Sequence, residues 1–201
     1  MKLNVPILTG VILAQTLSTV NGAVLGFQPS ATVVPAVGGF QVSLTVSGLG
    51  AGTAPSLGVF DLDVAYDPGI VGLASVGFGD PGLGDQLDLS GFGSITSFDG
   101  SVPGQLNLFE LSLDTVADLD TLQADSFALC VLSFTPLATG VSALTVSVNL
   151  IGDSNGDPLA VDVSPGSITV VPEPGAWGVA LAIGLLLWVR VSRVKPRSLR
   201  T

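Results

Sequence analysis

Oxygen-bearing side chains stand at alternate positions in one short segment of the chain. Asp153, Asn155 and Asp157 match positions 1, 3 and 5 of a calcium-binding loop. The pattern then departs from an EF-hand, because Pro158 stands where glycine is required and Ser164 where glutamate is required. We therefore expect a hairpin turn here. Calcium is the alternative, and it is the only cofactor that the sequence suggests.

A second group of carboxylates lies between residues 61 and 67. Asp61 and Asp63 would share one face of a β-strand, and Asp67 follows closely. Their oxygens could together hold a cation. A solvated strand face is the favoured interpretation, because carboxylates that point into water need no ligand.

Glu110 is the only glutamate before Glu173. It is in phase with Leu106 and Leu108, which predicts an inward side chain, while Phe109 and Leu111 hold the opposite phase. A β-bulge near Leu108 would resolve this conflict. The alternative is a buried carboxyl with a raised pKa, paired with an aspartate as in a glycosidase.

The missing residue types exclude most other chemistry. No Lys, Arg or His occurs from Leu3 to Val189, so a Ser-His-Asp triad, a Schiff base and phosphate-neutralising contacts to nucleic acid all lack their residues. The single cysteine, Cys130, excludes an internal disulfide and is expected to be a buried apolar residue. Of the 16 acids, all but Glu173 lie in the body, which leaves a charge near −15 there. We predict no catalysis and no nucleic-acid partner.

Strict alternation of apolar and polar residues predicts the elements that must position these groups. It is clearest at Phe40, Val42, Leu44 and Val46, whose intervening residues are polar. Strands are predicted at residues 31–37, 40–46, 60–66, 70–76, 105–111, 126–134, 144–150, 159–163 and 167–171. Turn signals rich in Pro, Gly, Asp and Asn separate them. About nine antiparallel strands in about 150 residues are typical of a β-sandwich.

Two segments depart from this pattern. Residues 78–102 are rich in Gly and Asp and predict a long loop. Leucines and a valine recur at every third position within residues 113–122, which predicts a short helix over residues 114–124.

Three stretches carry a resemblance to cohesin-like domains. They are residues 26–29, the alternating residues 41–46 and, above all, residues 58–68, which end in Tyr66-Asp67-Pro68. Cohesin-like domains are nine-stranded sandwiches of the jelly-roll type, related to a carbohydrate-binding superfamily. The resemblance implies an all-β, cohesin-like jelly-roll β-sandwich for residues 23–171. It does not extend to a dockerin partner, because no dockerin-contact pattern can be matched residue by residue.

Both ends of the chain predict export signals. Residues 1–22 begin with Lys2, continue with an apolar stretch and end in small residues, as in a secretory signal peptide. Residues 175–189 form an unbroken apolar run that as a helix would span roughly 22 Å. We expect this run to form a single transmembrane helix.

The apolar run lies between a Pro-Glu-Pro motif, made of Pro172, Glu173 and Pro174, and a basic tail. The tail contains Arg190, Arg193, Lys195, Arg197 and Arg200. Positive charges stay on the cytoplasmic side, so the body would be periplasmic.

Residues 172–201 resemble the PEP-CTERM sorting signal of Gram-negative bacteria, which is recognised by exosortase, a membrane-embedded cysteine peptidase. The resemblance implies an exosortase partner and cleavage near residues 172–174. The body would then move from the inner membrane to the cell surface or extracellular matrix. Permanent anchoring in the inner membrane is the alternative.

These observations favour an exported, sorted protein with a structural or adhesive role and no catalysis. The alternative is a binding module for carbohydrate, such as exopolysaccharide, or for a surface protein, with calcium assisting. A hydrolase that depends on Glu110 ranks third, because basic and aromatic residues that would line a sugar site are lacking.

Overall fold

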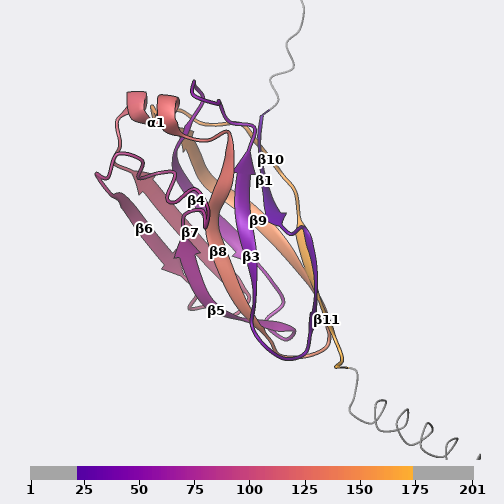
Figure 1. The fold of residues 1–201 in the computed structure, drawn as a ribbon. Coiled ribbons are helices and arrows are strands. Elements are labelled where there is room, and N and C mark those ends of the chain that lie inside the picture. Colours follow the sequence, from indigo (N-terminus) through magenta and orange to yellow (C-terminus); the bar gives the residue numbers. More distant parts are fainter. Residues whose placement is uncertain (1–21, 174–201) are drawn as a thin grey trace, which may run out of the picture.

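The computed structural model describes residues 22–173, which form two β-sheets packed face to face and one short helix (Figure 1). The elements, in chain order, are β1 (Ala23–Gln28), β2 (Ala31–Pro35), β3 (Phe40–Ser47), β4 (Leu57–Ala65), β5 (Val71–Phe78), β6 (Ser94–Asp99), β7 (Gln105–Ser112), α1 (Val116–Leu122), β8 (Ser126–Pro136), β9 (Gly140–Asp153), β10 (Val161–Val163) and β11 (Gly166–Val171). The predicted all-β sandwich is confirmed.

The described residues contain eleven strands rather than about nine. Each of the nine predicted segments forms a strand, with ends displaced by a few residues. The two additional strands are β1 and β6, and β6 corrects the prediction that residues 78–102 are a loop throughout. The sequence of β6, Ser-Ile-Thr-Ser-Phe-Asp, gives no period-two signal, because nearly all its residues are exposed at the edge of the sheet.

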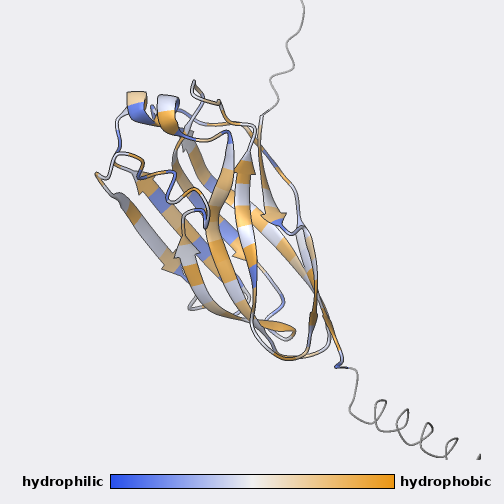
Figure 2. Cartoon of the chain, in the orientation of Figure 1, coloured by the Kyte–Doolittle hydropathy of each residue, from blue (hydrophilic) through white to orange (hydrophobic). Residues whose placement is uncertain are grey.

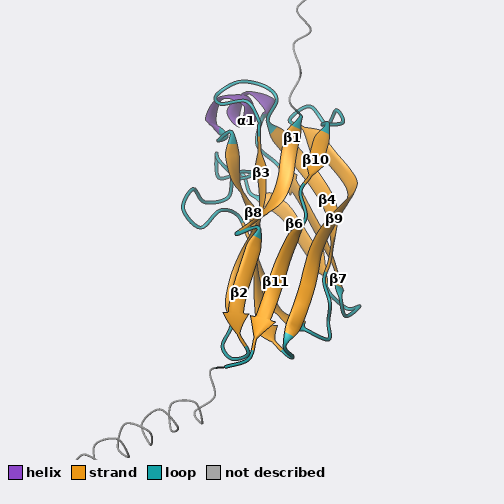
Figure 3. Ribbon diagram, turned by 90° about the vertical axis from the view of Figure 1, so that its right-hand side faces the viewer, coloured by secondary structure: helices purple, strands orange, loops and turns teal. Residues whose placement is uncertain are grey.

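The strand order is β10-β1-β3-β8-β5 in one sheet and β2-β11-β9-β4-β7-β6 in the other. Most neighbours are antiparallel, but β1 pairs with β10, and β2 with β11, in parallel. The first strands of the domain are thus hydrogen-bonded to the last ones in both sheets, and β2 is seen beside β11 in Figure 3. The domain begins and ends at opposite ends of the sandwich (Figure 1).

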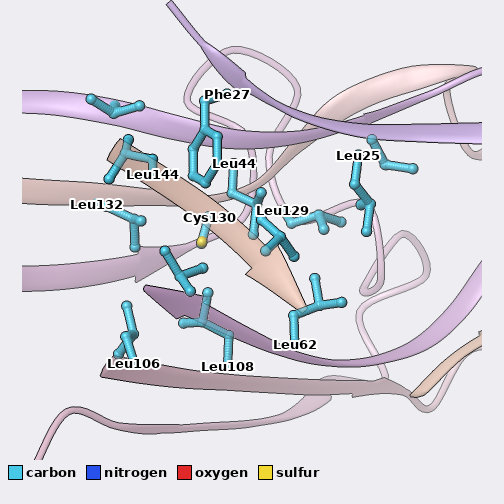
Figure 4. Packing of buried hydrophobic residues seen from close by; sticks show 14 of the residues in the cluster. Leu25, Phe27, Leu44, Leu62, Leu106, Leu108, Leu129, Cys130, Leu132 and Leu144 are labelled. Carbon is cyan, nitrogen blue, oxygen red and sulfur yellow. The ribbon is translucent and has the colours of Figure 1, made fainter. Parts of the chain in front are cut away.

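Alternating burial along the strands builds one core between the sheets. In β3, Val42, Leu44 and Val46 are buried while the residues between them are half-buried. Figure 2 shows this alternation as changes of hydropathy along single strands. Leucines of the two sheets point toward one another across the core (Figure 4). Burying each such side chain contributes about 1.5–3 kcal/mol to the stability of the sandwich.

The helix α1 lies within the predicted residues 114–124. Thr115 is its N-cap, with its side-chain oxygen accepting the backbone N–H of Asp118 at 3.2 Å. Leu119 is its buried residue. Asp120 Oδ1 also accepts the hydroxyls of Ser56 at 2.5 Å and Ser154 at 2.9 Å, so the helix is held by an apolar contact, a polar cap and hydrogen bonds to neighbouring segments.

Several predicted features lie outside the described residues. They are residues 1–21 of the signal peptide, Pro174, the apolar run 175–189 and the basic tail. Within residues 22–173, no helix has the length and apolar character needed to cross a membrane.

Candidate functional site

Four polar side chains meet on the outer face of the six-stranded sheet. Asp61 and Asp63 come from β4, Asn107 from β7 and Asn149 from β9, and we call them the Asp–Asn quartet. Asn107 Nδ2 donates to Asp61 Oδ1 at 2.7 Å and to Asp63 Oδ1 at 2.9 Å. Asn149 Nδ2 donates to Asp61 Oδ1 at 3.2 Å and to Asp63 Oδ2 at 2.9 Å. Each amide therefore bridges both carboxylates.

Strand register explains this meeting. β4 lies between β7 and β9, and Asp63 is paired directly with Asn107. On the other side, Asp61 is paired with Leu150 and Leu62 with Val148, so that Asn149 is the additional residue of a β-bulge. A bulge changes the direction of a side chain, and here it accompanies an amide that reaches both aspartates.

The quartet carries negative charge without a neighbouring cation. Hydrogen bonds from the Asn107 amide, and then from that of Asn149, lower the pKa of Asp63, which favours its ionised form. Residues 22–173 contain no Lys, Arg or His that could form an ion pair with either aspartate. The amides hold the carboxylates in place but do not neutralise them.

Apolar side chains border the quartet on the same outer face. The register places Ile95, Leu111 and Val59 in one row across β6, β7 and β4. Ile95 is 51% exposed and Leu150 is 48% exposed. On its other side, the quartet adjoins a hollow of about 280 Å³. Its lining includes Asp63, Asp99, Ser101, Gln105, Asn107 and Ser147. Val64, Ala65 and Val102 also line the hollow, so the face offers carboxylates, a hollow of mixed polar and apolar lining, and exposed apolar area together.

The other predicted oxygen ligands hold turns. Asp67 Oδ1 accepts the backbone N–H of Gly69 at 2.8 Å and does not join the quartet. Asp153 Oδ1 accepts the backbone N–H of Asn155 at 2.8 Å and that of Asp157 at 2.9 Å, which closes the predicted turn. In the described part of the chain, no three or more Asp, Glu, Cys or His residues are grouped so that they could hold a metal ion. Calcium binding at residues 153–157 stays a prediction.

Glu110 points into the sandwich and is 1% exposed. The pairing of β7 with β4 and with β6 runs through Leu108 without a shift, so the predicted bulge is wrong. β7 carries apolar residues in both phases without a bulge, because Leu106 and Leu108 point into the core while Phe109 and Leu111 are half-buried on the outer face. Burial raises the pKa of Glu110 to about 8, as the alternative interpretation expects. Such an enclosed carboxyl gives no access to a polysaccharide, however, so this geometry does not support a glycosidase pair.

Cys130 is fully buried among apolar side chains in β8, as predicted (Figure 4). Burial raises the pKa of its thiol to about 12. The thiolate, which is the reactive form, is therefore suppressed.

Sequence reasoning missed the contribution of Asn107 and Asn149 to this face. Both residues fall in the outward phase of predicted strands, so their direction was detectable. Their contact with Asp61 and Asp63 was not, because alternation along one strand contains no information about which strand lies beside it.

No family model and no curated protein matches this chain. Solved structures do match it. A non-cellulosomal cohesin from Archaeoglobus fulgidus is 18% identical with a TM-score of 0.53, over 79% of this chain and 96% of that one. A cohesin in a type I cohesin–dockerin complex from Clostridium thermocellum is 10% identical with a TM-score of 0.58, over 75% of this chain and 100% of that one. The sixth cohesin of scaffoldin B from Acetivibrio cellulolyticus, in complex with a dockerin, is 16% identical with a TM-score of 0.56, over 75% of this chain and 100% of that one.

The chain has the cohesin fold. The matches span nearly the full length of each cohesin structure, so the resemblance noted in residues 26–29, 41–46 and 58–68 extends to the whole described domain. At these identities the similarity establishes the fold. No enzyme family is indicated for the chain.

Proposed function

We propose that this protein is an exported, non-catalytic binding module whose outer six-stranded sheet docks a protein partner. The observation that carries the proposal is the Asp–Asn quartet, in which two carboxylates are held on a rigid sheet without a cation. Carboxylates fixed in advance lose little conformational entropy on binding. A module that binds a protein partner in this way would have a structural or adhesive role at the cell surface.

The chemistry of the face indicates the partner. The carboxylates of Asp61 and Asp63 can accept hydrogen bonds from Arg, Lys or hydroxyl donors. The body of this chain contains no Arg or Lys, so a cationic donor would have to come from a partner. Ile95, Leu111 and Leu150 provide adjoining apolar area. Cohesin-fold chains are found in complexes with dockerin proteins. By analogy, we infer a protein partner with a cationic or hydroxyl-bearing face rather than a polysaccharide.

Matched variants test this proposal. The full-length protein would be used to capture partners from surface extracts of the producing cells. Asp61→Asn with Asp63→Asn removes both charges but keeps the side-chain size, and is expected to weaken capture of the partner at least about tenfold. Asp125→Asn with Asp162→Asn, at exposed positions between α1 and β8 and on β10, is the control for net charge.

Equal loss in both double variants would indicate a net-charge effect and reject the quartet as the docking site. Undiminished capture by Asp61→Asn with Asp63→Asn would reject it as well. Binding to exopolysaccharide but to no protein would favour the carbohydrate-binding alternative.

We also propose that exosortase processes the chain near Pro172, Glu173 and Pro174. In support, β11 ends at Val171, and Pro172 and Glu173 are exposed and follow it. Cleavage there would release an intact sandwich, because no strand would be cut. Mass spectrometry of the native protein with and without exosortase tests this. An unchanged mass together with continued residence in the inner membrane would contradict sorting and favour a permanent anchor.

A further inference from the structure

Glu110 lies among groups that do not neutralise it. Its direct strand partners are Phe60 on β4 and Thr96 on β6. Across the core, its charge acts on the thiol of Cys130 in β8. Asp85 and Asp88, from the segment between β5 and β6, are the charged groups that face it. No basic residue occurs in the described chain to balance these acids.

One hydroxyl bridges two carboxyl groups at this point. Ser94 Oγ lies 2.8 Å from Glu110 Oε1 and 3.1 Å from Asp85 Oδ2. A hydroxyl carries a single proton and can donate to only one of the two oxygens. If both carboxyls were ionised, the other contact would bring two oxygens together with no hydrogen between them. A second proton is therefore required at the bridge.

The remaining oxygen indicates which carboxyl holds that proton. Glu110 Oε2 is buried and has no hydrogen-bond partner. A buried oxygen without a hydrogen-bond partner costs far more free energy when it belongs to an ionised carboxylate than when it is the carbonyl oxygen of a neutral carboxyl group. Asp85, in contrast, has a partner on each oxygen, because Oδ1 accepts the backbone N–H of Leu87 at 2.9 Å and Oδ2 lies beside Ser94 Oγ.

We propose that Glu110 is protonated at neutral pH and donates to Ser94, which donates to Asp85, and that this proton clamps the segment 79–93 and the beginning of β6 onto the sandwich. Loss of the proton in alkali opens the clamp. The inference concerns the inner face of β7, and it is independent of the proposed docking face.

The bridge lies where this segment joins the edge strand. Ser94 is the first residue of the edge strand β6, and Asp85 lies in the segment that leads to it. Asp88 Oδ1 accepts the backbone N–H of Gly93, and Ser112 Oγ donates to the carbonyl of Leu87. Elsewhere the segment is anchored independently of the bridge, since Leu87 is buried in the core, Gln86 is hydrogen-bonded to Gln123 and Ala124, and Asp80 accepts the backbone N–H of Ala128. Removing the bridge is therefore expected to loosen first the part beside it, from Leu87 to Ser94. The raised pKa of Glu110, about 8, places the change just above neutrality.

The chain contains only two glutamates, Glu110 and Glu173, which makes a direct test possible. The full-length protein, labelled with ¹³C at glutamate side-chain carboxyls and kept in a mild detergent, would give two NMR signals. Glu110→Gln assigns them by removing one. We expect the Glu110 signal to titrate above pH 7, because burial raises its pKa. A Glu110 midpoint in the acidic range would overturn the proposal.

Two further measurements separate the clamp from mere burial. Asp85→Asn removes a charge that raises the pKa of Glu110, so its midpoint is expected to fall by about one unit. Asp162→Asn, on the edge strand β10, is the control and should leave the midpoint unchanged. In hydrogen exchange, the Leu87 and Gly93 amides should lose protection above the Glu110 midpoint in wild type but not in Glu110→Gln. Protection that does not change across the midpoint would overturn the clamp.

Discussion

Glu110 sets the expected pH dependence of stability at the residue scale. In the folded chain it keeps its proton up to about pH 8, whereas its ordinary pKa is 4.5. Between these values the folded state binds one more proton than the unfolded state, so the free energy of unfolding falls as pH rises. The slope is at most about 1.4 kcal/mol per pH unit, and the loss is complete above about pH 8.

Asp80 changes the stability with pH in the opposite direction to Glu110. The backbone N–H of Ala128 donates to its carboxylate and lowers its pKa. This contribution to stability is present above the ordinary aspartate pKa and is lost as the pH falls through the lowered value. Together with Glu110, it predicts a stability maximum in mildly acidic solution.

Urea unfolding of the full-length protein between about pH 4 and about pH 9 checks this prediction. Glu110→Gln keeps the shape but cannot ionise, so it should be about 3 kcal/mol more stable than wild type at pH 7. The two curves should converge below about pH 4.5. Asp162→Asn should follow wild type throughout. Parallel curves for wild type and Glu110→Gln would contradict the assignment.

Gln123 illustrates what residue-level reading of the sequence could not reach. It is 2% exposed, its Oε1 accepts the backbone N–H of Leu57, and its Nε2 donates to the carbonyls of Leu57 and Gln86. It therefore joins the end of α1 to the start of β4 and to the segment 79–93. Nothing local to residue 123 indicates this role, because its partners lie 66 and 37 residues away.

At the scale of elements, α1 depends on its cap. Thr115 Oγ1 accepts the backbone N–H of Asp118, and its hydroxyl donates to the Asp118 carboxylate at 2.7 Å. We expect Thr115→Ala to lower the free energy of unfolding by about 1 kcal/mol, because an N–H of the first turn would lose its partner. Denaturant unfolding measures the change.

Thr121 provides the matched control for this variant. Its hydroxyl donates to the Ala117 carbonyl within the helix rather than capping an end. Thr121→Ala should alter stability by less than about 0.5 kcal/mol. Equal losses in the two variants would show that hydroxyl removal, and not capping, is responsible.

The strands differ in how well their sequences predict them. β3 and β4 are half-buried strands of a sandwich, so alternation marks them clearly. β6 is an edge strand with little burial and carries no such signal. The bulge in β9 was equally hidden, since a bulge exists only relative to the partner strand β4. Alternation thus marks strands that have one face in the core, but it marks neither the exposed strand β6 nor a bulge.

At the scale of the whole molecule, the main electrostatic feature is the excess of acidic over basic residues. The body holds 15 of the 16 acidic residues and no basic ones. Mutual repulsion of like charges opposes the compact state, and salt screens it. Raising NaCl from about 0.01 M to about 1 M shortens the Debye length from roughly 30 Å to roughly 3 Å. We expect a gain of about 1 kcal/mol, or roughly 2–4 °C in the unfolding midpoint of the full-length protein.

A variant with less charge provides the control for this effect. Asp125→Asn with Asp162→Asn removes two exposed charges and should reduce the response to salt. A midpoint that falls with salt in wild type, or an identical response in the variant, would contradict a repulsive origin.

The sequence by itself determined the direction of each side chain along a strand, because successive residues of an extended chain point to opposite faces. It also determined the lack of basic residues and hence the excluded chemistry. Only the tertiary structure decided which strands became neighbours. Asn107 and Asn149 reach Asp61 and Asp63 from 44 to 88 residues away. Glu110 likewise meets its bridging hydroxyl through the edge strand β6, because the pairing of strands depends on burial of the whole core and not on local pattern.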